Sequence, residues 1–178
     1  AASDSYDIYM GAQGITFMRW QFSEITSLPD EKLRFHLYDV GGSFGQRSLA
    51  YPEYAAQMIA AKNLGRPIKW ISSRSEGFLS DAHGRAMHMS GELALDSQGR
   101  FLAARYDLIS DMGAYLTLTA SNSHVRNPAT AMTGVYRIPA LHGSFRLVFT
   151  NTVPVGSYRG AGRPDIAYVV ERLVGKAA

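Results

Sequence analysis

Residues 39–47 read Asp39-Val-Gly-Gly-Ser-Phe-Gly-Gln-Arg47, a loop with three glycines and one aromatic residue. The preceding run, Leu33 to Val40, alternates apolar and polar residues as a half-buried strand does, and the run over 50–64 has helical periodicity. The glycines therefore lie at a predicted strand-to-helix turn. Because glycine has no Cβ, the backbone can bend sharply there and approach a ligand closely. We expect a ligand site in this loop.

Further elements are predicted on both sides of the loop. An amphipathic helix is expected over 15–28, with no complete element before it, and a strand is expected over 67–72. Alternating runs around the turn at 96–99 predict a β-hairpin over 86–109. We expect a polar surface loop up to residue 127, a strand over 143–150 and a last helix from Pro164. Helices mixed with hairpin strands indicate an α+β fold.

The composition excludes several classes of protein. With 178 residues, 46% of them hydrophobic, the chain can form a packed core, and its net charge of +3 is spread over scattered Lys and Arg residues. The absence of cysteine excludes disulfides, thiolate metal sites and a thiol nucleophile, and the five histidines show no metal-binding spacing. No apolar run is long enough for a membrane span and no signal peptide is evident. We expect a cytoplasmic location, with the periplasm as the alternative.

A second glycine loop covers residues 155–163. Arg159 and Arg163 flank two glycines, Tyr158 is adjacent and a helix is predicted directly behind. Backbone N–H groups at a helix start, together with two guanidinium groups, suit a phosphate or another oxyanion. Arg-Gly segments of RNA-binding proteins are repeated and disordered, whereas this one is single and flanked by regular structure. A small anionic ligand is therefore favoured over nucleic acid.

The first glycine loop also matches the G-x-S-x-G pattern of a hydrolase nucleophile elbow. A triad could be drawn from Ser43, then Asp107 or Asp111, then His124 or His142. Against it, such an elbow follows several parallel strands, and only one strand is predicted before Ser43. A third interpretation is a structural module in which the glycines serve only the geometry of the turn. Phosphate-loop and dinucleotide-binding patterns are absent.

Several short motifs follow one another along the chain. They are Ala12-Gln-Gly14, Gly41-Gly-Ser-Phe-Gly-Gln-Arg47, Arg66-Pro-Ile-Lys-Trp70, Asp111-Met-Gly-Ala-Tyr115, Thr150-Asn151, Ser157-Tyr-Arg-Gly-Ala-Gly-Arg163 and Glu171-Arg-Leu173. In this order they resemble the molybdenum-cofactor-binding large subunit of the xanthine dehydrogenase, aldehyde oxidase and carbon monoxide dehydrogenase family. The resemblance implies that 1–178 is a molybdopterin-binding segment, a fragment of a larger subunit.

The resemblance also implies a cofactor and a site. The cofactor is a molybdenum–pyranopterin, carried in bacterial members as a cytosine dinucleotide, while iron–sulfur clusters and FAD belong to partner subunits or domains. By resemblance, the side-chain amide of Gln13 contacts an oxygen ligand of the metal. The two loops approach the metal centre through Gly42, Phe44 and Gly45 in the first and through Tyr158, Arg159 and Gly160 in the second. A neutral amide can donate a hydrogen bond there without competing as a ligand.

Two departures from the family pattern bear on function. Ser43 replaces a glycine of the first loop, and Gly160 stands where carbon monoxide dehydrogenases carry a copper-binding cysteine. The resemblance therefore favours oxidation of an aldehyde or N-heterocycle, with water as the oxygen source, over copper-dependent oxidation of carbon monoxide. Glu171 does not match the family's catalytic glutamate, which lies near the end of the full subunit. We expect the chain to be inactive without the remainder of that subunit.

Overall fold

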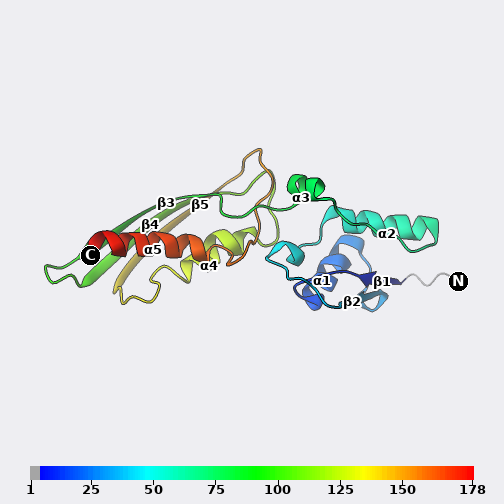
Figure 1. The fold of residues 1–178 in the computed structure, drawn as a ribbon, viewed down its shortest axis with the longest axis horizontal. Coiled ribbons are helices and arrows are strands. Elements are labelled where there is room, and N and C mark those ends of the chain that lie inside the picture. Colours follow the sequence, from blue (N-terminus) through cyan, green and yellow to red (C-terminus); the bar gives the residue numbers. More distant parts are fainter. Residues whose placement is uncertain (1–4) are drawn as a thin grey trace. The chain divides into compact units, whose positions relative to one another are not determined.

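The computed structural model of the protein describes residues 5–178, which form two compact units. The first unit ends at Ser80 and the second begins at Asp81. Each unit combines helices with a small sheet (Figure 1), which confirms the predicted α+β class.

The first unit is built on a pair of parallel strands. Tyr6 pairs with Leu33, and the register continues to Tyr9 and His36. The first unit also contains two longer helices and one short helix. The elements are β1 (Tyr6–Tyr9), α1 (Ile15–Thr26), β2 (Leu33–His36), α2 (Pro52–Leu64) and α3 (Arg74–Ser80), with single 3-10 turns at Asp30–Lys32 and Gln46–Ser48.

Local sequence explains where the two longer helices of the first unit begin and end. Helix α1 contains neither glycine nor proline, and it ends where Ser27 adopts a left-handed conformation with φ of 56°. Helix α2 begins with Pro52, which suits a first helical turn, and ends at Gly65 with φ of 60°. Their inner faces meet β2 in one apolar core. It is formed by Ala12, Met18, Phe22, Leu33 and Met58.

The second unit is a three-stranded sheet with a long helix along it (Figure 1). The hairpin of β3 (Met87–Leu95) and β4 (Phe101–Asp111) is antiparallel, and β5 (Ala140–Val148) pairs with β4 in parallel. Between β4 and β5 lie a π-helical turn (Asn122–Arg126) and α4 (Asn127–Ala129), and α5 (Arg163–Ala177) ends the unit. The buried core consists of Ala104, Tyr106, Leu108, Met132, Ile166 and Val170.

Most of the predicted elements are confirmed, with small shifts at their ends: the first two helices, the hairpin, the last strand and the last helix. Four predictions are wrong. The strand expected up to Val40 ends at His36, and residues 67–73 form neither helix nor strand. Strand β1 precedes the first helix, where no complete element was expected, because four residues are too few for a periodic pattern to emerge.

The polar stretch that ends at residue 127 is the fourth wrong prediction. Ala120, Ser123 and His124 within it are almost completely buried, at 0% or 1% exposure. The residues 122–126 form a π-helical turn rather than a loop. Thr117, Thr119 and Ser123 of this stretch hydrogen-bond to the segment that contains the second glycine loop, as described below.

Candidate functional site

The first glycine loop has a left-handed backbone at three residues. Gly42, Phe44 and Gly45 have φ values of 104°, 54° and 105°. A Cβ on Gly42 would lie 2.9 Å from the Phe44 ring, so the ring packs against the bare backbone of that glycine. The ring nevertheless remains 54% exposed. The loop therefore presents an aromatic face beside glycine backbone, at the cost of about 1 kcal/mol for the conformation of Phe44.

Gln13 is hydrogen-bonded to this loop through both its backbone and its side chain. Its backbone N–H donates to the Arg47 carbonyl at 3.0 Å. Its side-chain Oε1 accepts from the Ser43 hydroxyl at 2.8 Å, and the Gly45 N–H donates to the Ser43 Oγ at 3.3 Å. The structure thus brings together the four site residues predicted in the first unit.

Gln21 is a functional candidate that the sequence analysis missed. It is buried in α1, where its Nε2 donates to the Ser48 carbonyl at 3.0 Å and its Oε1 accepts from the Ala50 N–H at 2.9 Å. Both bonds fix the segment that follows the first glycine loop. The sequence did contain a signal for its burial. Gln21 lies within the apolar stripe of a predicted helix, next to Phe22 and three residues after Met18.

The second glycine loop reverses the chain directly before α5. Gly160, Ala161 and Gly162 have consecutive positive φ values of 94°, 49° and 85°. A Cβ on Gly162 would overlap the backbone carbonyl of Ser123, so the site admits only glycine. The loop is therefore a tightly packed turn with a fixed conformation.

Arg85 clamps this loop from the start of the second unit. Its guanidinium pairs with Asp165 at 3.0 Å and donates to the Arg159 carbonyl at 2.6 Å. It also lies over the Tyr158 ring, 5.4 Å from the ring centre. The clamp fixes the backbone at Tyr158 and Arg159, while both side chains are exposed.

Residues 117–127 hold the loop from another side through four polar side chains. Each contributes a hydrogen bond to the segment that contains the loop. The bonds join Thr117 Oγ1 to the Val155 carbonyl (2.7 Å), Thr119 Oγ1 to the Ser157 N–H (3.1 Å), Ser123 Oγ to Ser157 Oγ (2.8 Å) and Asn127 Nδ2 to the Ala161 carbonyl (2.9 Å). Since buried polar groups must be paired, this network accounts for the polar composition of the segment.

Two of the candidate triad residues, His124 and Asp111, have shifted pKa values. Burial lowers the pKa of His124, whose Nδ1 contacts the Ala120 carbonyl at 3.0 Å, and its Nε2 has no partner among the described residues. Hydrogen bonds from the Thr150 hydroxyl and the Gly113 N–H lower the pKa of Asp111. At neutral pH the imidazole is therefore neutral and the carboxylate ionised.

These contacts do not form a hydrolase triad. The Ser43 hydroxyl donates to an amide oxygen rather than to a histidine, and Asp111 is engaged by Thr150, Gly113 and Thr152. Among the described residues of the second unit, no hydrogen bond joins Asp107 or Asp111 to His124 or His142. A serine nucleophile needs a base within hydrogen-bonding reach, so the structure gives the hydrolase alternative no support.

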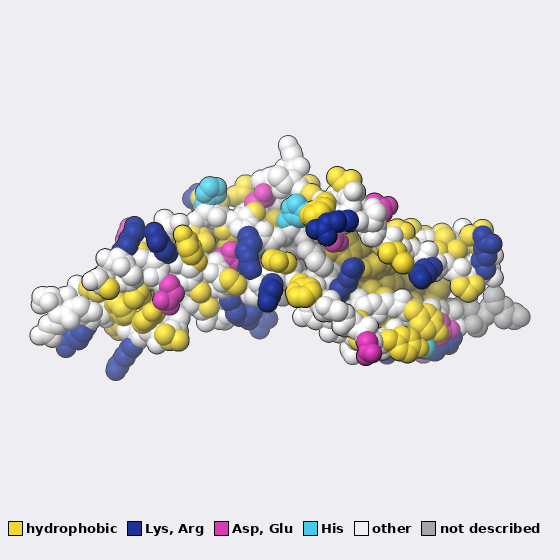
Figure 2. All heavy atoms as spheres, viewed as in Figure 1, with side chains coloured by type: hydrophobic (Ala, Val, Ile, Leu, Met, Phe, Trp, Pro, Cys, Tyr) yellow, Lys and Arg dark blue, Asp and Glu magenta, His cyan; other side chains and the backbone are white. Residues whose placement is uncertain are grey.

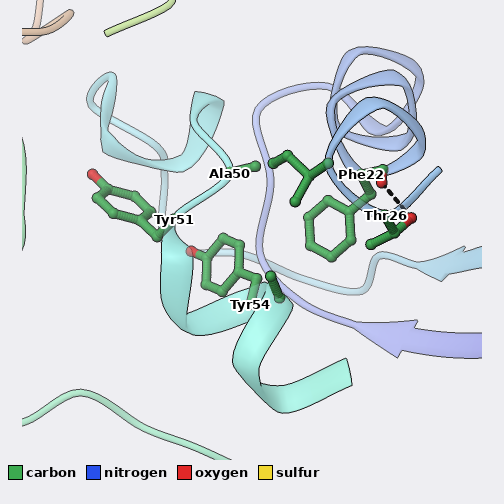
Figure 3. Close-up of a pocket in the computed structure, with 7 residues that line it drawn as sticks. Phe22, Thr26, Ala50, Tyr51 and Tyr54 are labelled. Atoms are coloured by element: carbon green, nitrogen blue, oxygen red, sulfur yellow. Dashed lines mark hydrogen bonds between the residues drawn. The ribbon is translucent and has the colours of Figure 1, made fainter. Parts of the chain in front are cut away.

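Other surface features do not resemble a catalytic site. A shallow pocket between α1 and α2 (Figure 3) is lined by apolar and aromatic side chains, and the Thr26 hydroxyl in it donates to its own helix at the Phe22 carbonyl. Lys and Arg side chains are dispersed over the face shown in Figure 2 rather than gathered in one patch. Among the described residues there is no cluster of His, Asp and Glu able to hold a metal, and no helix long and apolar enough to cross a membrane.

The first glycine loop is thus joined to an exposed amide, and the second is held in place by Arg85 and by residues 117–127. The model of the molybdopterin cofactor-binding domain family matches residues 1–178, and the chain belongs to this family. This confirms the resemblance drawn from the ordered motifs.

Relatives of known identity agree with this assignment. The chain is 33% identical to the carbon monoxide dehydrogenase large chain of Hydrogenophaga pseudoflava, over 93% of its own length and 21% of that protein. It is 36% identical to the gamma subunit of the 6-hydroxypseudooxynicotine dehydrogenase complex of Paenarthrobacter nicotinovorans, over 85% and 19%. The crystal structure of quinoline 2-oxidoreductase from Pseudomonas putida 86 matches with a TM-score of 0.91 and 32% identity, over 98% of this chain and 22% of that one. The chain thus spans about a fifth of the length of these relatives.

The residues present fit a molybdenum–pyranopterin. A pterin cofactor brings its own ligands to the metal, so the protein must supply hydrogen-bond donors and a fitted surface rather than a ligand cluster. Gln13 has an exposed amide, and both loops turn on glycines with a left-handed backbone. Neither the neutral amide nor the loop backbone would displace the ligands that the pterin brings to the metal.

Proposed function

We propose that the chain holds the molybdenum–pyranopterin of a hydroxylase through its two glycine loops. In the first unit the contacts come from Gln13, Gly42, Phe44 and Gly45. In the second unit they come from Tyr158, Arg159 and Gly160. The observation that carries the proposal is the attachment of Gln13 to the first loop, which leaves its Nε2 unbonded within the described residues.

Each group has a physical role in this proposal. The Gln13 Nε2 donates a hydrogen bond to an acceptor at the metal centre, and the Phe44 ring covers one side of the cofactor against water. Arg159 brings a positive charge to an anionic group of the cofactor, and the Arg85 clamp keeps its backbone in place. When bound, the cofactor supplies the redox chemistry that transfers oxygen from water to the substrate.

The proposed whole protein oxidises an aldehyde or an N-heterocycle. The absence of cysteine supports this choice over copper-dependent oxidation of carbon monoxide, since no thiolate is available in the second loop. We further propose the cytosine dinucleotide form of the cofactor, partner subunits with iron–sulfur clusters and FAD, a catalytic glutamate elsewhere in the large subunit, and a cytoplasmic location. Relatives named as subunits of a dehydrogenase complex and of a nicotine hydroxylase support the partner subunits.

Metal and pterin analysis tests this function. The protein that carries this chain, produced with its partner subunits, should contain molybdenum and pterin in equal amounts. Gln13→Ala and Arg159→Ala should each weaken cofactor retention about 10-fold, the effect expected when a residue that contacts a metal centre is removed. Arg105→Ala, which removes only an exposed ion pair with Glu92 on the sheet, should retain the cofactor. Wild-type protein without molybdenum would overturn the proposal.

A further inference from the structure

Ser43 makes the only hydrogen bond to the Gln13 side chain among the described residues. Its Oγ is 2.8 Å from the amide oxygen of Gln13, and the same Oγ accepts the Gly45 N–H at 3.3 Å. The Ser43 carbonyl accepts the Gln46 N–H at 3.1 Å, so its backbone is held as well. The Ser43 hydroxyl therefore connects the loop backbone at Gly45 to the side-chain amide of Gln13 through two hydrogen bonds.

The hydrogen bonds of the Ser43 hydroxyl bear on which end of the Gln13 amide faces it. A hydroxyl has one proton to donate, and the Gly45 N–H already occupies an acceptor position on the Ser43 Oγ. The hydroxyl proton is donated to the Gln13 Oε1. If the amide turned over, its NH₂ group would face the hydroxyl and the hydroxyl proton would lose its acceptor. The arrangement therefore favours one of the two orientations of the amide.

We propose that Ser43 is a positioning residue that fixes the Gln13 amide with its NH₂ group, rather than its oxygen, presented to the cofactor. This rests on the function proposed above. The backbone bond from Gln13 N–H to the Arg47 carbonyl holds the residue beside the loop, and within residues 5–178 the Ser43 hydroxyl is the hydrogen-bond partner of its amide. A glycine at this position would leave the amide free to turn.

The test compares Ser43→Ala, Ser43→Gly and Ser43→Thr in the complete, cofactor-loaded protein. The readouts are molybdenum content, the electron paramagnetic resonance spectrum of the partly reduced metal, and kcat and KM measured separately. Removal of the hydroxyl in the Ala and Gly variants should preserve molybdenum content but give a shifted or mixed spectrum, with kcat several-fold lower and KM unchanged. Ser43→Thr keeps a hydroxyl and should restore the wild-type spectrum.

Ser23→Ala is the matched control, because it removes a hydroxyl bonded to the Leu28 carbonyl at the far end of α1. It should leave the spectrum unchanged. Wild-type spectra and kcat in both Ser43→Ala and Ser43→Gly, with molybdenum present, would overturn the inference and leave the proposed function intact. Wild-type protein without molybdenum would overturn both.

Discussion

At the scale of single residues, backbone strain gathers at the two loops. Four non-glycine residues among those described have a positive φ. Phe44 and Ala161 lie within the glycine loops, and Arg85 is the residue that clamps the second loop. Such conformations persist where the surrounding contacts impose them, which occurs often at ligand-binding sites. The fourth, Ser27, ends helix α1, so three of the four lie in or against the two glycine loops.

His124 makes the stability of the second unit depend on pH. Burial lowers its pKa, although Asp165 and Asp111 favour its charged form. In the unfolded chain it binds a proton near its ordinary pKa of about 6.5, whereas the folded unit resists protonation. Stability is therefore full above this value and falls as pH decreases below it, by up to about 1.4 kcal/mol per pH unit. Chemical unfolding of the second unit at pH 7.5 and pH 5 should show this loss.

Two variants give the pH prediction its control. His124→Leu removes the titrating group and should flatten the dependence between pH 7.5 and 5. His142→Gln changes an exposed histidine of β5 and should leave it as in the wild type. An equal pH dependence in His124→Leu and the wild type would show that another group is responsible.

At the scale of elements, helices and strands were predicted correctly where the sequence has a long periodic pattern of apolar residues. Helix α1 and the hairpin of β3 and β4 have long apolar patterns, and their positions follow from those patterns. The segment 117–127 has a loop-like composition, and its burial depends on partners such as Ser157 that lie more than thirty residues away. Long-range hydrogen bonds leave no local periodic signal, so this segment could not be predicted from composition.

The joint between the second glycine loop and α5 should not tolerate a side chain. Gly162→Ala places a methyl group against the Ser123 carbonyl and requires a left-handed alanine. We expect a loss of about 3 kcal/mol in the unfolding free energy of the second unit. Both tryptophans lie in the first unit, so the measurement requires hydrogen exchange or circular dichroism rather than tryptophan fluorescence.

Gly175→Ala is the matched control within α5. No atom lies within 4 Å of the added methyl group, and alanine favours the helix, so the variant should be neutral or stabilised by up to about 1 kcal/mol. Equal effects of the two substitutions would contradict the close packing of the loop against residues 117–127.

At the scale of the whole molecule, each unit contributes one glycine loop. The sequence could predict both loops, because glycines interrupt two regular patterns, and the order of the motifs pointed to the family. The sequence could not predict the hydrogen bonds that hold the two loops in their conformations. The Ser43 link to Gln13 spans 30 residues, and the bond from Arg85 to the Arg159 carbonyl spans 74. Such contacts arise only when the chain is folded.

Anomalous X-ray scattering at the molybdenum absorption edge, from crystals of the complete loaded protein, tests the central claim most directly. The account predicts a molybdenum peak beside the first glycine loop, with the Gln13 Nε2 about 3 Å from an acceptor at the metal centre and the second glycine loop in contact with the cofactor. A molybdenum peak surrounded by other parts of the protein, with neither glycine loop touching the cofactor, would contradict it.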